Sequence, residues 1–196
     1  GVYNQYQFYQ KYVEPVLNGS QVQRIFVVVS DALRYEVAEQ LAQEVHETGR
    51  VSVETDSILG VLPSYTQLGK AVLLPMPKHP PLITYKDGQK AVFVDGKSSA
   101  GEEARSAILQ AVEGVAIDYV KLKAFNKSQL REFSKPYKIV YIYHNTIDYH
   151  GDSRRTQHDT VDVCARAINE LNQLINRLMG DANASRIFVT ADHGFL

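Results

Sequence analysis

The segment Phe188–Val189–Thr190–Ala191–Asp192–His193–Gly194 decides how the rest of the chain is interpreted. It predicts a short apolar strand that ends in an acid, an imidazole and a glycine. In an open parallel sheet, ligands bind beyond the carboxyl ends of the strands. An acid beside a histidine offers a metal one hard and one borderline ligand. Taken alone, this segment is explained equally well by a strand followed by a solvated polar turn. The residues at the other strand ends must therefore decide between a metal site and a plain turn.

Two further segments, Arg24–Val29 and Tyr137–Tyr143, are apolar and rich in β-branched or aromatic residues, which predicts strands buried on both faces. Amphipathic helices are expected between the strands, over Tyr35–Glu47, Glu102–Val112, Asn126–Phe133 and Asp159–Met179. The alternation of strands and helices predicts an α/β fold. We expect a doubly wound, mostly parallel sheet with helices on both faces.

Other segments carry weaker signals. Val51–Ile58 predicts a second strand, and the apolar residues after Thr66 predict a helix. A small inserted hairpin is expected from Leu82–Tyr85 and Ala91–Val94. The pattern over Tyr119–Phe125 leaves its structure open.

We expect two regions along the chain. Residues 1–20 form an N-terminal helix or linker rich in aromatics, with the helical pattern running from Tyr3 to Leu17, and residues 21–196 form the core domain. Because the sequence begins without Met and stops soon after Gly194, we interpret it as a piece of a longer protein whose core is incomplete at its C-terminus.

Composition excludes several classes of protein. The net charge of −1 provides no global field for nucleic acid or an anionic membrane, although a local basic patch stays open. Cys164 is the single cysteine, so a disulfide framework is excluded and a reducing, cytoplasmic location is expected. No apolar run reaches the ~18 residues of a membrane span.

Polar residues also follow the other predicted strands. Asp31 stands at a strand-to-helix turn, and Thr66 or Ser64 stands at a helix start, although capping alone would explain each of them. The segment 144–152 holds two acids, Asp148 and Asp152, together with two histidines and a glycine. So many acids at one sheet edge would repel one another unless cations bind. Two metals about 4 Å apart are the usual arrangement for phosphate ester chemistry.

At this point the chain resembles the alkaline phosphatase superfamily, and more closely its PglZ branch. The matching motifs lie in the family's order at Ser30–Arg34, Leu62–Thr66, Asn145–Asp152 and Thr190–Gly194. The resemblance implies a metal-dependent phosphoesterase of a bacterial phage-defence system. The expected substrate is a phosphodiester or phosphate ester, including nucleotide-type substrates, and the expected partners are other components of the defence complex.

The resemblance also implies roles for single residues. Thr66 matches the nucleophile, which also binds a metal, whereas Ser64 does not match it. Asp31 and the pair Asp192–His193 would hold that same metal. Asp148 and Asp152 would hold a second one.

The chain departs from the family pattern in three places. Asp152 stands where superfamily nucleotide pyrophosphatases have His, which makes the second site more acidic. We therefore expect zinc at the first site and Mn²⁺ or Mg²⁺ at the second, with His150 able to change that second preference. A later family histidine has no counterpart, so these 196 residues alone are expected to be nearly inactive. Gly69 stands where other members have Asn, and Lys70 is expected to contact phosphate or solvent.

Two other functions remain open. A catalytically degenerate domain could keep the fold and serve assembly of the defence complex. A phosphomutase-like transferase would act on a sugar phosphate.

Overall fold

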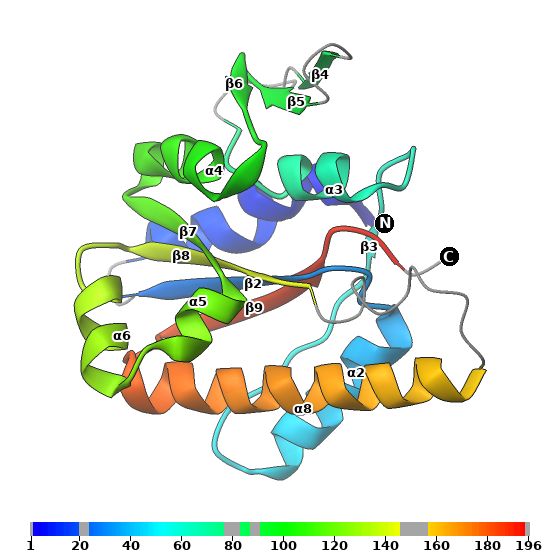
Figure 1. The fold of residues 1–196 in the computed structure, drawn as a ribbon, viewed down its shortest axis with the longest axis vertical. Helices are drawn as coiled ribbons and strands as arrows, with labels where there is room; N and C mark the ends of the chain where they lie inside the picture. Colours follow the sequence, from blue (N-terminus) through cyan, green and yellow to red (C-terminus); the bar gives the residue numbers. More distant parts are fainter. Residues whose placement is uncertain (1, 20–23, 77–82, 87–90, 146–156, 195–196) are drawn as a thin grey trace.

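A computed structural model describes residues 2–19, 24–76, 83–86, 91–145 and 157–194. Figure 1 shows a central sheet with helices above and below it. The sheet has four parallel strands in the order β7-β8-β2-β9. They are β2 (Ile25–Ser30), β7 (Gly114–Asp118), β8 (Ile139–His144) and β9 (Arg186–Ala191). The predicted α/β class with a mostly parallel sheet is confirmed.

The register of the sheet brings three strand ends together. Ser30 of β2 lies opposite both His144 of β8 and Ala191 of β9. Because the three strands are parallel, the residues that follow them leave the sheet along the same edge. The chain positions of Asp31 and Asp192 are thereby adjacent in space, although 160 residues separate them.

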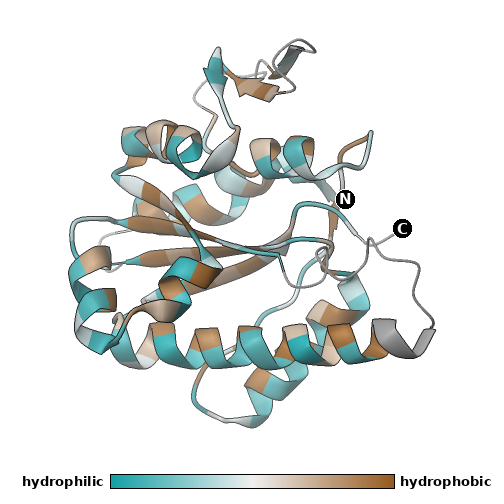
Figure 2. Ribbon diagram, viewed as in Figure 1, coloured by the Kyte–Doolittle hydropathy of each residue, from teal (hydrophilic) through white to brown (hydrophobic). Residues whose placement is uncertain are grey.

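Helices cover both faces of the sheet (Figure 1). Those below it in the view are α2 (Tyr35–Glu47), α5 (Tyr119–Ala124), α6 (Lys127–Ser134) and α8 (Gln157–Asp181). The other face carries α3 (Thr66–Val72), α4 (Gly101–Leu109) with η4 (Gln110–Val112), and the N-terminal elements η1 (Gln5–Gln7), η2 (Tyr9–Val13) and α1 (Glu14–Leu17). The apolar colour of the strands in Figure 2 agrees with their burial between these two layers.

Strand β2 serves two hydrophobic cores because successive side chains of a strand point to opposite faces. Phe26 and Val28 pack with α2 and α8 in one core. Ile25, Val27 and Val29 pack in the other core, with the N-terminal segment, α3 and α4. All six residues of β2 are buried, which explains why its sequence is continuously apolar rather than alternating.

The N-terminal segment differs at its start from the helix expected over Tyr3–Leu17. It begins as a short strand, β1 (Tyr3–Asn4), which pairs in parallel with β3 (Ile58–Leu59). Helical turns follow, and Phe8 and Val13 are buried in the core shared with α3. Among the aromatic residues of the segment, Phe8 and Tyr9 therefore pack on the body of the domain, whereas Tyr3 and Tyr6 are exposed.

The strand predicted over Val51–Ile58 is wrong over nearly its whole length, since β3 begins only at Ile58. Val51 and Val53 still pack against the core beside α2 and α8, while Ser52 between them is exposed. The alternation of apolar and polar residues therefore reflects a half-buried segment. Before Ile58, that segment does not pair with any of the described strands.

Strand β7 was not predicted from the sequence. The strand is short, and three of its five residues, Gly114, Ala116 and Asp118, have low β propensity. Gly114 is required there because a Cβ would lie 2.6 Å from Cγ2 of Ile139 on the neighbouring strand. Close packing between strands thus overrides propensity.

Turn chemistry decides the segments after β7. The Asp118 side chain accepts a hydrogen bond from Val120 N and so caps the start of helix α5. This helix occupies most of the segment Tyr119–Phe125, whose structure the sequence pattern left open. The predicted cap Asn126 is confirmed, and it forms a reciprocal capping box with Gln129.

A second, small sheet contains β4 (Ile83–Lys86), β5 (Ala91–Val94) and β6 (Lys97–Ser98) in that order. Its strands pair antiparallel, and the turn between β4 and β5 lies outside the described residues. Among the helices of the described ranges, none is long and apolar enough to cross a membrane.

Candidate functional site

Two buried acids stand at the carboxyl edge of the main sheet. Asp31 follows β2 directly and Asp192 follows β9, and their exposed fractions are 2% and 1%. Asp31 N donates a hydrogen bond to His144 O over 2.7 Å, which continues the β2–β8 ladder by one residue. The sheet therefore fixes the backbone of the first acid before any ligand is considered.

Thr66 stands at the start of helix α3, as predicted. It does not follow a strand of the main sheet, however, so the helix rather than a strand end brings it to this edge. That helix lies close to Asp192, since a Cβ on Gly69 would sit only 2.1 Å from Asp192 O. A glycine is required for this approach, which places both Thr66 and Lys70 beside the acids.

The side chains of Thr66, His193 and the two acids converge. Thr66 Oγ1 lies 3.0 Å from His193 Nε2. The same nitrogen lies 3.3 Å from Asp31 Oδ1 and 3.8 Å from Asp192 Oδ2. One ligand atom from each of Asp31, Asp192 and His193 lies within 4.8 Å of the others, a spacing that can hold a metal ion.

Hydrogen bonds to neighbouring groups hold one atom of each acid and of the imidazole, and the other atom of each faces the cluster. Asp192 Oδ1 accepts hydrogen bonds from Ala32 N (3.2 Å) and His193 N (2.8 Å). His193 Nδ1 lies 2.9 Å from the carbonyl of Gly194, which can only accept, so Nδ1 carries the proton and Nε2 presents a lone pair. Within the described structure, the buried atoms Asp31 Oδ1 and Asp192 Oδ2 accept no hydrogen bond. The free lone pairs thus point at one another, as metal ligands held by outer contacts do.

Charge in this cluster is only partly balanced. Burial and the neighbouring Asp31 carboxylate raise the pKa of Asp192 to about 7. Lys70 Nζ donates to Asp31 Oδ2 over 2.6 Å and lies 3.9 Å from Asp192 Oδ2. Two carboxylates therefore face one resident ammonium.

Lys70 is buried rather than solvated, with 8% of its surface exposed. Beyond Asp31, its Nζ donates to Asn145 Oδ1 over 3.3 Å. Its position as the fourth residue after Thr66 puts the two on the same side of α3, which explains why both reach the site. The predicted phosphate contact of Lys70 stays a prediction.

Gln5 is a member of the site that the sequence did not indicate. Its Nε2 donates to Ala191 O (3.0 Å) and Asp192 O (2.7 Å), and its Oε1 accepts from Val61 N (3.0 Å). The side chain is 2% exposed. It ties the N-terminal segment to β9 and to the loop before Thr66, a role that leaves no motif in the sequence.

Comparison with known proteins shows the family to which the chain belongs. Residues 8–196 match the family model described as the BREX system PglZ alkaline phosphatase-like domain. The chain belongs to the PglZ family. It is 42% identical over 196 residues to the alkaline phosphatase-like protein BrxZ of Escherichia coli O9:H4 (strain HS). It is 37% identical over 198 residues to the alkaline phosphatase-like protein PglZ of Bacillus cereus (strain H3081.97). All of the chain is covered in both comparisons, but it spans only 22% of the length of either relative.

The remaining predicted ligands of this PglZ-family chain, Asp148 and Asp152, lie outside the described residues, as does His150. His144, just before them, is fully buried and does not join the cluster. Its ring nitrogens lie 3.0 Å from Ser30 Oγ and 3.1 Å from Glu170 Oε2. Burial lowers the pKa of His144, and the Glu170 carboxylate opposes that shift in part.

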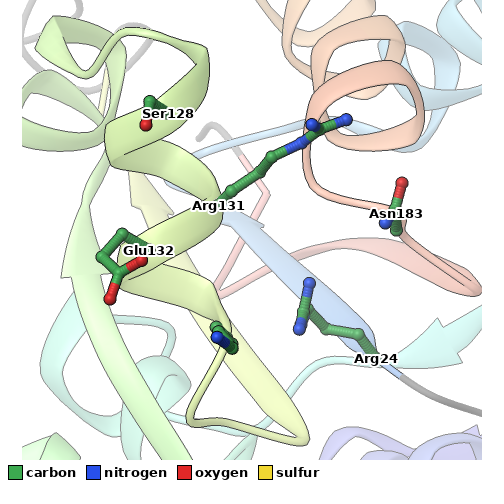
Figure 3. Close-up of a pocket in the computed structure, with 6 residues that line it drawn as sticks. Arg24, Ser128, Arg131, Glu132 and Asn183 are labelled. Atoms are coloured by element: carbon green, nitrogen blue, oxygen red, sulfur yellow. The ribbon is translucent and has the colours of Figure 1, made fainter.

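A separate pocket of about 450 Å³ lies at the opposite end of the sheet, where β2 begins (Figure 3). Its lining residues are Arg24, Ser128, Arg131, Glu132, Lys135 and Asn183. Arg24 Nη1 donates to Ala182 O (2.7 Å) and Arg131 Nε to Asp181 O (2.8 Å). Both arginines therefore cap the carboxyl end of α8, which is a structural role.

Proposed function

We propose that this chain carries the catalytic centre of a metal-dependent phosphoesterase with Thr66 as the nucleophile. The observation that supports it most is the convergence of four candidate ligand atoms, which are Asp31 Oδ1, Asp192 Oδ2, His193 Nε2 and Thr66 Oγ1. The two carboxylate oxygens accept no hydrogen bond in the described structure, and the imidazole nitrogen and the hydroxyl lie 3.0 Å from each other. A set of two carboxylates, an imidazole and a hydroxyl suits zinc, which accepts mixed oxygen and nitrogen ligands.

The chemistry assigned to Thr66 is phosphoryl transfer to its own hydroxyl. A divalent metal at this position would lower the pKa of that hydroxyl and offset charge on the phosphoryl oxygens. Thr66 Oγ1 loses its proton to solvent and bonds to phosphorus, while the bond from phosphorus to the leaving alcohol oxygen breaks and that oxygen takes up a proton. Attack of water on the phosphorylated threonine then breaks its bond to phosphorus and restores the hydroxyl, and it releases phosphate from a monoester substrate or a phosphate monoester from a diester. Asp31 and Asp192 would hold the metal during both steps.

A second metal is proposed from the sequence resemblance, at Asp148 and Asp152. Carboxylate oxygens are hard ligands, so this site should prefer Mn²⁺ or Mg²⁺ and exchange more readily than the zinc site. Titration of the metal-free full-length protein with Zn²⁺ and Mn²⁺, beside the variant Asp152→His, tests this. Equal zinc affinity at both sites, unchanged by the substitution, would contradict it.

The family description supports a biological setting as well. We propose that the protein acts within a BREX phage-defence system, on a phosphodiester or nucleotide-type phosphate ester, together with other components of that system.

The decisive experiment compares Thr66→Ala with Ser64→Ala in the full-length protein. Removing the nucleophile should lower metal-dependent hydrolysis of a generic phosphate ester at least ~10³-fold without unfolding the protein. Ser64→Ala should stay close to the wild type, because Ser64 is not one of the converging side chains. Wild-type turnover by the Thr66→Ala variant would show that another group attacks phosphorus.

One observation favours the degenerate alternative, an assembly domain without activity. Lys70 already places an ammonium 2.6 Å from Asp31 Oδ2, which offsets part of the charge that a metal would offset. Elemental analysis of the purified full-length protein separates the two functions. Bound metal with hydrolysis supports the enzyme, whereas a folded, metal-free and inactive protein supports assembly alone.

A further inference from the structure

Two buried hydrogen-bond donors beside the candidate site have no partner in the described part of the chain. They are the hydroxyl of Tyr143 and Nε of Arg105. Leaving a buried polar group unpaired is costly, so such groups indicate a missing partner. The two unpaired acceptors at the metal ligands call for a cation, whereas these two donors call for an anion.

The position of Tyr143 connects the donors to the site. Tyr143 is 2% exposed and lies opposite Val29 of β2, one residue before the end of β8. The Arg105 guanidinium of α4 lies 3.9 Å from the centre of the Tyr143 ring, and Lys70 Nζ lies 5.9 Å from it. Lys70 in turn contacts Asp31. The Tyr143 ring therefore lies close to both Arg105 and Lys70, and Lys70 links this group of side chains to the Asp31 carboxylate.

Both groups are donors at neutral pH. Burial raises the pKa of Tyr143 far above its ordinary value, so the hydroxyl keeps its proton. Arg105 donates through Nη1 to Ser99 O over 3.2 Å, a contact that anchors the guanidinium and leaves Nε unused. An arginine stacked on an aromatic ring keeps a fixed orientation, which suits recognition of an anion with several oxygens.

We propose that Tyr143 and Arg105 form an anion subsite that binds non-bridging oxygens of a phosphoryl group next to the metal ligands. This proposal rests on the proposed function and adds the part of the substrate that is recognised. A phosphoryl group has enough oxygens to face the metal ligands on one side and these donors on the other. It accepts hydrogen bonds without donating any, which matches what the two donors lack.

The sharpest test compares Tyr143→Phe with Tyr141→Phe in the metal-loaded full-length protein. Both residues lie on β8 and face the same core, but the Tyr141 hydroxyl donates to Leu73 O over 2.8 Å. Tyr143→Phe should weaken binding of inorganic phosphate about tenfold or more, because it removes a hydrogen bond to a charged ligand. The unfolding midpoint should stay the same or rise, because no protein hydrogen bond is lost.

Tyr141→Phe should give the reverse result, with a lower unfolding midpoint and unchanged phosphate affinity. Arg105→Met should weaken phosphate binding at least as much as Tyr143→Phe does. Its control is Arg131→Met at the far end of the sheet, which should leave phosphate affinity unchanged. Phosphate binding is measured by isothermal titration calorimetry, independently of turnover.

The outcomes separate this subsite from the proposed function. If the wild type hydrolyses phosphate esters but Tyr143→Phe and Arg105→Met bind phosphate as it does, the subsite is overturned and the enzyme stands. If the wild type binds phosphate through these residues but hydrolyses nothing, the subsite stands and the enzyme assignment fails. A wild-type protein that binds metal but no phosphate would overturn the subsite as well.

Discussion

At the scale of single residues, the site depends on contacts made by atoms that take no part in chemistry. Gln5 holds the carbonyls of Ala191 and Asp192 and the amide of Val61 through one buried carboxamide. It lies three residues before the start of the matched family region, which begins at residue 8. Gln5 is therefore a positioning residue. A protein fragment that began at residue 8 would lack it.

Gln5→Glu tests this role. The substitution keeps the shape of the side chain but replaces the donor that faces two carbonyls with an oxygen, which leaves those acceptors unpaired. Metal affinity of the full-length protein should fall roughly 10–100-fold, as it does for the loss of other outer contacts to metal ligands. Competition titration with a zinc-binding dye measures the change.

Gln7→Glu is the matched control, because Gln7 uses only its Oε1 in its contact with Asn4 N, and a glutamate keeps that acceptor. It should bind metal as the wild type does. Equal metal affinity of both variants would show that Gln5 does not position the site.

At the scale of elements, helix α3 brings Thr66, the proposed nucleophile, to the acids. It begins at Thr66 and contains Gly69 and Lys70, so its distance from the end of β9 sets the geometry of the whole cluster. Gly69 allows the helix to approach β9 this closely, because the backbone of Asp192 leaves no room for a Cβ at that position.

Gly69→Ala should therefore separate α3 from β9. We expect a loss of about 1–3 kcal/mol in the free energy of unfolding, the usual cost of overpacking a buried contact, together with weaker metal binding. Gly180→Ala in α8 is the control, since nothing lies within 4 Å of the added Cβ. It should stabilise the protein by up to about 1 kcal/mol because alanine favours helices. Urea denaturation measures both values, and a stabilising Gly69→Ala would contradict the close approach.

At the scale of the whole molecule, one buried polar network joins the sheet to its longest helix. His144 links Ser30 of β2 to Glu170 of α8 through its two ring nitrogens. Because a carboxylate only accepts, Nε2 carries the proton and Nδ1 accepts from the Ser30 hydroxyl. The network works with a neutral imidazole, which agrees with the lowered pKa of His144.

This network predicts a pH dependence of stability. The pKa of His144 is lower in the folded state than the ordinary value of 6.5, so the unfolded chain binds more protons between the two values. The contribution of His144 to the free energy of unfolding is therefore complete above pH ~6.5. It is lost as pH falls through the pKa of the folded state, and the free energy of unfolding then changes by at most ~1.4 kcal/mol per pH unit. The raised pKa of Asp192 has the opposite effect on the pH dependence of stability. The effect of His144 is therefore measured by comparing the wild type with a His144 variant.

Chemical denaturation of wild type and His144→Gln between pH 5 and pH 7 provides that comparison, and the variant should lose less stability on acidification. His46→Gln, at an exposed position of α2, serves as the control and should follow the wild type. Parallel pH profiles for wild type and His144→Gln would exclude His144 as the group responsible.

The sequence by itself determined the elements with strong local signals. Continuous apolar strands and amphipathic helices predicted the α/β class, and Asn126 predicted its helix start, because periodicity and capping are local properties. The strand ends at Asp31 and Asp192–His193 were likewise readable, since parallel strands deliver their carboxyl ends to one edge.

Tertiary structure alone decided the rest. The pairing of β1 with β3, the short strand β7 and the loss of a strand over Val51–Ile58 depend on which segments find partners, which no local pattern records. The same holds for the burial of Lys70 against Asp31 and for the contacts of Gln5 and Tyr143. These side chains acquire their roles only when residues far apart in the chain meet, because packing and the pairing of buried polar groups are properties of the folded molecule.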